Sequence, residues 1–202
     1  RRLSVAAEKL AHSSSSSSPD AATHAPSLNV RRVWCTNSFF MVKLNDSGGY
    51  KNVRRWSKKA KVPDIFALQK MVVPVNIRNM HWTSVHVDFL QREIVFYDSM
   101  GGAGEHYMEA TLGYLKAEHE KKKGTPLPKA DEWKMYNTGT RVPQQKNGSD
   151  CGMFTCAFAM FLTDPCVCGQ GGKLGISLDF GQGDMPLLRK RLACDILRAH
   201  LD

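Results

Sequence analysis

The segment VPQQKNGSDCGMFTCAFAMFL, residues 142–162, places a cysteine directly in front of a long apolar run. Cys151 to Leu162 is apolar on nearly every face, which predicts a buried helix, and Ser149 or Asp150 is a candidate N-cap. Cys151 would occupy the first turn of that helix, where free backbone N–H groups and the helix dipole favour a thiolate. A thiolate held there could act as the nucleophile of an acyl-transfer reaction.

His81 and Asp98 are the best candidates for the base that activates the thiol and for the group that orients the base. His81 opens a segment that is predicted to be a strand, and a side chain on a rigid sheet can be aimed at a neighbour. Asp98 ends the next predicted strand and precedes a Ser-Met-Gly-Gly turn. A carboxylate bonded to the imidazole would fix its tautomer and support the imidazolium, as the third member of a triad does.

An acyl-transfer site also needs hydrogen-bond donors for the oxyanion. The backbone N–H of Cys151 is one, and the side-chain amide of Gln145 is a candidate for the second. Loss of one such donor typically costs about 10²–10³ in rate. Gln144 is a rival for this role, and spacing alone does not choose between the two glutamines.

Each of these residues also has a structural interpretation. Cys151 could be a buried thiol, His81 a histidine at a strand end, and Asp98 a turn former. His86 is a weaker candidate base, because it shares a strand face with Asp88. A cysteine with a histidine elsewhere is a weak signal, so the residues alone leave the catalytic and the structural interpretations open.

Two strands are expected to position the histidine and the carboxylate. In residues 83–89, the side chains alternate between two faces with the period of a half-buried strand. Glu93 to Tyr97 forms the second strand, with a turn at Gln91-Arg92. This hairpin would place Asp98 opposite Val85, so a bend after the second strand has to bring the carboxylate to the imidazole.

The other segments favour an α+β fold. Residues 33–44 are compatible with a helix, residues 107–123 have the pattern of a surface helix, and an amphipathic helix follows Asp184. Pro74, inside an apolar β-branched run, indicates an edge or a strand start, and residues 133–138 predict a short strand. Strands and helices are therefore segregated along the chain, which is typical of α+β domains.

The 202 residues suit one domain preceded by a tail. Residues 1–30 are rich in Ser and Ala and poor in apolar side chains, which predicts a disordered tail, and residues 31–202 are the expected catalytic domain. No apolar run approaches the ~18 residues of a transmembrane helix. The six cysteines do not resemble a disulfide scaffold, which favours a reducing intracellular compartment.

The net charge of +9 could serve an acidic protein partner, nucleic acid or solubility. Residues 54–61, RRWSKKAK, form the sharpest basic run and could be a nuclear-import or nucleic-acid patch. A nucleic-acid motif and interleaved stacking aromatics are missing, so no nucleic-acid partner is expected.

Cys166 and Cys168 are too close for an ordinary zinc clip, so neither a metal nor another cofactor is expected.

The chain resembles the ubiquitin-like-protein-specific cysteine proteases, the SUMO (sentrin) proteases. The resemblance covers residues 34–201 and is carried by five stretches in the family's order: YKNVRRWSKKAKVPDIF, VVPVNIRNMHWTSVHVDF, IVFYDSMGG, VPQQKNGSDCGMFTCAFA and DMPLLRKRL. It implies a papain-like cysteine protease fold, an α+β domain with a mixed sheet and a buried helix that carries the nucleophile. It also implies cleavage after the C-terminal Gly-Gly of SUMO, in isopeptide deconjugation and in precursor processing.

The resemblance implies a role for each matching residue. Cys151 is the nucleophile, His81 the general base and Asp98 the residue that orients the base. Gln145, and not Gln144, donates to the oxyanion. Two residues are implied in substrate binding: Trp82 as a wall of the tunnel for the Gly-Gly tail, and Arg55 as a contact with the body of the modifier.

The family also carries a further segment ahead of residue 33, with a Trp-Leu-Asn-Asp-like motif, and residues 1–30 show nothing like it. Two alternatives stay open: a protease for another ubiquitin-like modifier, or, because of the missing segment, a catalytically weak SUMO-binding module. The expected partner is SUMO or a SUMO-conjugated protein, and the expected state is a monomer. The expected location is the nucleus or the cytoplasm, with the nucleus favoured.

Overall fold

The computed structural model describes residues 33–163 and 178–199. The predicted tail of residues 1–30 and the pair Cys166 and Cys168 lie outside the described residues. No described helix is long and apolar enough to cross a membrane.

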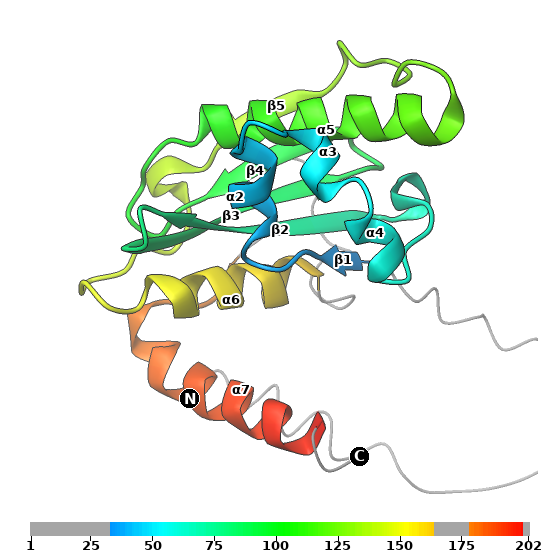
Figure 1. Cartoon of the computed structure of the whole chain (residues 1–202). Helices are drawn as coiled ribbons and strands as arrows, with labels where there is room; N and C mark the ends of the chain where they lie inside the picture. Colours follow the sequence, from blue (N-terminus) through cyan, green and yellow to red (C-terminus); the bar gives the residue numbers. More distant parts are fainter. Residues whose placement is uncertain (1–32, 164–177, 200–202) are drawn as a thin grey trace, which may run out of the picture. The chain divides into compact units, whose positions relative to one another are not determined.

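A five-stranded mixed sheet is the centre of the described fold (Figure 1). Its strands lie in chain order: β1 (Val33–Cys35), β2 (Lys70–Ile77), β3 (His81–Asp88), β4 (Glu93–Tyr97) and β5 (Lys134–Asn137). The two central pairings, β2 with β3 and β3 with β4, are antiparallel, while β1 and β5 run parallel to their neighbours. The mixed sheet and the segregated helices confirm the α+β prediction.

Helices cover both faces of the sheet (Figure 1). One face carries α2 (Phe40–Asn45), α3 (Tyr50–Val53), α4 (Trp56–Lys59) and α5 (Glu105–Lys123), and the other carries α6 (Cys151–Thr163), with α7 (Met185–Ala199) packed on α6. Three short 3-10 helices complete the described elements: η1 (Ile65–Ala67), η2 (Gly139–Arg141) and η3 (Gln182–Asp184). The helix predicted around Cys151 and the helix predicted after Asp184 are both confirmed.

Two apolar clusters lie on the two faces. The cluster under α2 and α5 is built around Phe40 and Tyr114, whose rings meet edge to face at 5.0 Å. The cluster under α6 includes Tyr97 and Phe158, with ring centroids 5.4 Å apart. Because α6 is buried between the sheet and α7, its first residue is held on a rigid element.

The structure corrects one prediction about the first strands and decides between the two alternatives for Pro74. Val33 to Cys35 is a strand and not part of a helix, because it pairs in parallel with the start of β2. Pro74 lies in the interior of β2 and not at its start. The pairing with β1 ends at Val72, so β2 is an edge on that side at Pro74, where a residue without an N–H is tolerated.

The strand β3 is buried on both faces, so the prediction of a half-buried strand is wrong. Residues 83–87 are all buried, because α6 covers the polar face of the strand. The hairpin register also differs from the expectation. Ser84 pairs with Tyr97 across a turn of four residues, 89–92, so Asp98 follows the ladder opposite Thr83 and not Val85.

The burial of β3 places the imidazole of His86 in the interior of the domain. Its Nε2 atom shares a hydrogen bond of 2.9 Å with Ser84 Oγ, and its buried Nδ1 atom has no partner among the described residues. Burial, with a smaller contribution from Lys70, lowers the pKa of His86 from 6.5 to about 3. The fold therefore requires a neutral imidazole at this position.

We expect His86 to make the domain acid-sensitive. Since the pKa is depressed on folding, stability is fully present above the unfolded value of 6.5 and is lost as pH falls toward 3. The loss at pH 5.5 relative to pH 7.5 should be about 1.4 kcal/mol from this group. Urea unfolding at both values should show a smaller difference for His86→Gln, and an unchanged difference would contradict the assignment.

Candidate active site

His81 and Asp98 form a hydrogen bond at one end of the sheet. His81 is the first residue of β3, and Asp98 directly follows β4. His81 Nε2 lies 2.7 Å from Asp98 Oδ1, with the imidazole 19% exposed and the carboxylate 4% exposed. The bend that the sequence required after Tyr97 is therefore present.

The turn after β4 fixes the carboxylate of Asp98. Oδ1 accepts the N–H of Met100 at 2.8 Å, and Oδ2 accepts the N–H of Gly102 at 3.0 Å. A Cβ atom at Gly102 would lie 2.4 Å from Oδ2, so the turn leaves room only for glycine there. Both oxygens are thus held by backbone donors in addition to His81.

This bonding selects the tautomer of His81. An ionised carboxylate only accepts hydrogen bonds, so the Nε2 atom that faces Asp98 carries the proton. The Nδ1 atom of the neutral ring then keeps its lone pair and is the basic atom. The pair Asp98–His81 is thereby arranged as an orienting group and a base.

Cys151 begins α6 and is 7% exposed. The helix packs on β3, and its second residue, Gly152, meets the ring of Trp82: a Cβ atom built there would lie 3.5 Å from Trp82 Cδ1. Trp82 directly follows His81, so this contact brings the first turn of α6 to the start of β3. The nucleophile candidate, the base candidate and the proposed tunnel residue therefore share one end of the sheet.

The two glutamines are held differently. The amide nitrogen of Gln144 lies near several backbone carbonyls, the shortest contact being 2.9 Å to Val142 O. The amide of Gln145 accepts from Ser99 Oγ at 2.6 Å and donates to Asn147 O at 2.5 Å. An amide nitrogen carries two hydrogens, and among the described residues only Asn147 O accepts from Gln145 Nε2.

Ser99 is a residue that sequence reasoning did not single out. Its hydroxyl orients the side chain of Gln145, and its carbonyl accepts the Gln145 N–H at 2.9 Å. Since Asp98 precedes it, one dipeptide positions both the base and the candidate oxyanion donor. The only indication of this role in the sequence was the position of Ser99 directly after Asp98.

The bonds of Asp150, whose partners Gln182 and Arg189 were not predicted, fix the turn before the nucleophile. The carboxylate of Asp150 accepts from Asn147 Nδ2 at 2.7 Å and Gln182 Nε2 at 2.6 Å, and it is bonded to Arg189 of α7. These bonds, that of Asn147 first, lower the pKa of Asp150 to about 2. The predicted N-cap residue therefore ties the start of α6 to the C-terminal helix.

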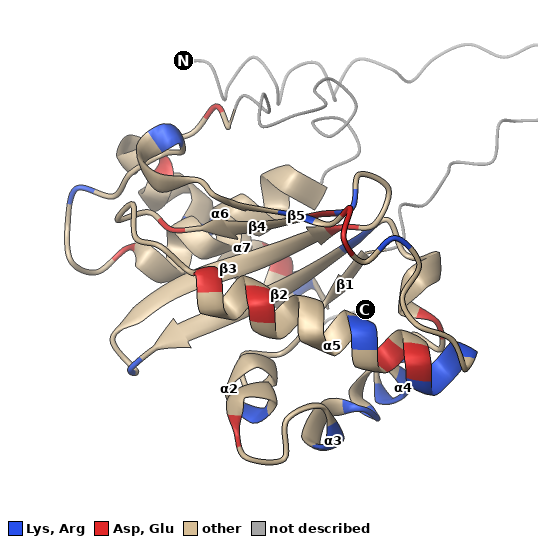
Figure 2. Cartoon of the chain, turned by 90° about the horizontal axis from the view of Figure 1, so that it is seen from above, with Lys and Arg blue, Asp and Glu red and all other residues tan. Residues whose placement is uncertain are grey.

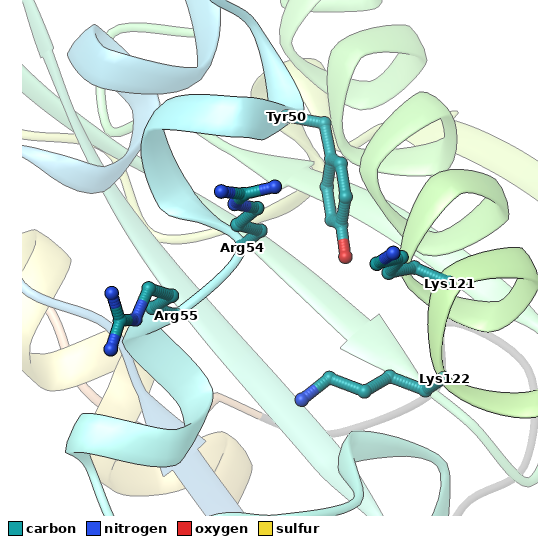
Figure 3. Close-up of a pocket in the computed structure, with 5 residues that line it drawn as sticks. All are labelled: Tyr50, Arg54, Arg55, Lys121 and Lys122. Atoms are coloured by element: carbon teal, nitrogen blue, oxygen red, sulfur yellow. The ribbon is translucent and has the colours of Figure 1, made fainter.

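Arg55 lies apart from this cluster. It precedes α4, at the end of the sheet away from the start of α6 (Figure 1). It lines a pocket of about 330 Å³ together with Tyr50, Arg54, Lys121 and Lys122 (Figure 3). The structure thus brings together five of the six residues predicted for the site and separates Arg55 from them.

The arrangement has the form of a cysteine-protease site on an α+β domain: a cysteine at the start of a buried helix, and a histidine and an aspartate at adjacent strand ends. The model of the Ulp1 protease family, C-terminal catalytic domain, matches residues 20–200. The chain belongs to this family.

Sequence similarity to individual proteases supports the family assignment. Sentrin-specific protease 2 of Mus musculus is 36% identical over 166 residues, which cover 82% of this chain and 26% of the relative. The putative ubiquitin-like-specific protease 1B of Arabidopsis thaliana is 36% identical over 170 residues, covering 82% of this chain and 46% of the relative. The chain thus spans less than half the length of either relative.

A solved structure extends the similarity to the fold. The C-terminal Ulp1 protease domain in complex with Smt3, the yeast ortholog of SUMO, has a TM-score of 0.66 and 26% identity. The match covers 86% of this chain and 72% of that chain. The sequence predicted a papain-like α+β fold, and this similarity identifies it as the Ulp1 protease fold.

Proposed function

We propose that this chain is a cysteine protease that cleaves after the C-terminal Gly-Gly of SUMO, in isopeptide conjugates and in precursors. The observation that carries the proposal is the 2.7 Å bond between His81 and Asp98, next to the helix that begins with Cys151. The family assignment and the Smt3 complex of the similar Ulp1 domain support SUMO as the modifier.

The reaction uses Cys151, His81 and Gln145 in sequence. His81 Nδ1 takes the proton of Cys151, and the thiolate attacks the carbonyl carbon of the terminal glycine. The oxyanion accepts hydrogen bonds from Gln145 Nε2 and the Cys151 N–H. His81 then returns the proton to the leaving amine, the C–N bond breaks, and a thioester remains. A water molecule deprotonated by His81 hydrolyses the thioester and restores the thiol.

Trp82 supplies a physical basis for the Gly-Gly preference. Its ring lies against Gly152 in the first turn of α6, beside the nucleophile. We propose that this indole wall narrows the approach to the thiol, so that a main chain without side chains fits best. Glycines are therefore the residues that reach the carbonyl-attack position.

Covalent capture tests the proposed modifier. SUMO and ubiquitin, each with a C-terminal electrophile, are incubated separately with the chain. An adduct with SUMO alone supports the proposal, while an adduct with ubiquitin alone indicates a protease for another modifier. Binding of SUMO to the folded chain without any adduct would indicate a binding module.

Gln145→Ala should lower kcat about 10²–10³-fold, because one oxyanion donor is lost. KM should change little, since the donor acts mainly in the transition state. Gln144→Ala is the matched control, and the comparison is a steady-state assay on a SUMO precursor. A larger loss of kcat for the Gln144 variant would reverse the assignment of the two glutamines.

A further inference from the structure

A pocket lined with basic side chains lies outside the proposed active site. Arg54 and Arg55 come from the junction of α3 and α4, and Lys121 and Lys122 from the last turn of α5 (Figure 3). Figure 2 shows the same concentration of blue on α3, α4 and the end of α5. Two chain segments far apart in sequence therefore supply the basic residues that line one pocket of about 330 Å³.

Most of this charge is not neutralised by the part of the chain that the structure describes. Arg54, Arg55 and Lys121 form no ion pair with any carboxylate of the described residues. Lys122 has one long contact, 3.9 Å to the buried Glu118. Like charges gathered without counter-charges repel one another, so an anionic ligand would relieve a cost that the free protein bears.

The pocket is also rigid at its base. Glu118, 1% exposed, accepts from Tyr50 Oη at 2.6 Å and from Ser57 Oγ at 3.3 Å. One buried carboxylate of α5 therefore fixes both α3 and α4, the two helices that flank the arginines. The Tyr50 ring, 5.9 Å from Tyr114, forms a wall that is in place before a ligand binds.

We propose that this pocket binds a phosphorylated serine or threonine within an acidic segment of a partner protein. A phosphate carries close to two negative charges and three acceptor oxygens, and arginine forks match it bidentately. All four cationic side chains are exposed, whereas sites for small molecules bury most of their ligand.

The experiment measures fluorescence anisotropy of the labelled peptide Gly-Asp-Asp-pSer-Asp-Asp-Gly and of its Ser counterpart. We expect the phosphopeptide to bind about tenfold or more tightly than the Ser peptide. Binding should fall by a similar factor in the triple variant Arg54→Ala, Lys121→Ala, Lys122→Ala. Arg55 is left in place, because it is the candidate contact with the modifier.

A second triple variant controls for net charge: Lys190→Ala, Arg191→Ala, Arg198→Ala, all exposed on α7. It should bind the phosphopeptide as the unaltered chain does. Equal binding of both peptides, or equal losses in both variants, would overturn the proposal. So would tighter binding of a DNA duplex or of pyrophosphate at this pocket, or a loss of SUMO binding in the first variant. These readouts are binding constants, so they do not depend on protease activity.

Discussion

Cys151→Ala is expected to abolish turnover of a SUMO precursor, with a fall in kcat on the order of 10⁴–10⁶-fold, as for removal of a triad nucleophile. The thiol is the atom that forms the covalent bond, and no neighbouring group can replace it. Binding of SUMO should persist, because the alanine leaves the Trp82 wall and the start of α6 intact. Single-turnover cleavage and a separate binding titration measure the two effects.

Cys156→Ala is the matched control, since it removes a thiol from the same helix. Burial raises the pKa of the Cys156 thiol, so it is a poor nucleophile at neutral pH. Cleavage by this variant should be close to normal once its folding is verified. If the Cys156 variant lost activity and the Cys151 variant kept it, the proposed mechanism would be wrong.

The parts of the site that depend on local sequence could be predicted. The apolar run after Cys151 and the strand Glu93–Tyr97 follow from periodicity, and both are confirmed. His81 at a strand start and Asp98 at a strand end follow from the same patterns. The short distance between His81 and Asp98 could not be predicted from these patterns. It depends on the four-residue turn between the strands and on the turn that holds Asp98.

The parts that depend on long-range contacts were missed. Ser99 meets Gln145 across 46 positions, and Arg189 meets Asp150 across 39. Glu118 reads as a solvated charge on a surface helix, yet it is buried because Tyr50 and Ser57 satisfy its oxygens. Periodicity shows which face of a helix is apolar, but it does not show which polar groups another segment will bring to it.

Asp98→Asn is expected to lower kcat about 10⁴-fold while the fold is preserved, as in other triads whose aspartate is replaced. The physical reason lies in the fixed donors around this side chain. The backbone N–H groups of Met100 and Gly102 occupy both oxygen positions. The N–H₂ group of an asparagine must therefore oppose the Gly102 N–H, or it must face both the Met100 N–H and His81.

The second orientation changes the tautomer of the base. If the amide donates to Nε2, the proton of the neutral imidazole moves to Nδ1, and Nδ1 can no longer accept the proton of Cys151. Asp88→Asn is the matched control, since Asp88 also lies at a strand end and accepts the N–H groups of Leu90 and Gln91. It should retain nearly full kcat. Activity of the Asp98 variant within tenfold of the unaltered chain would show that the carboxylate serves the turn and not the imidazole.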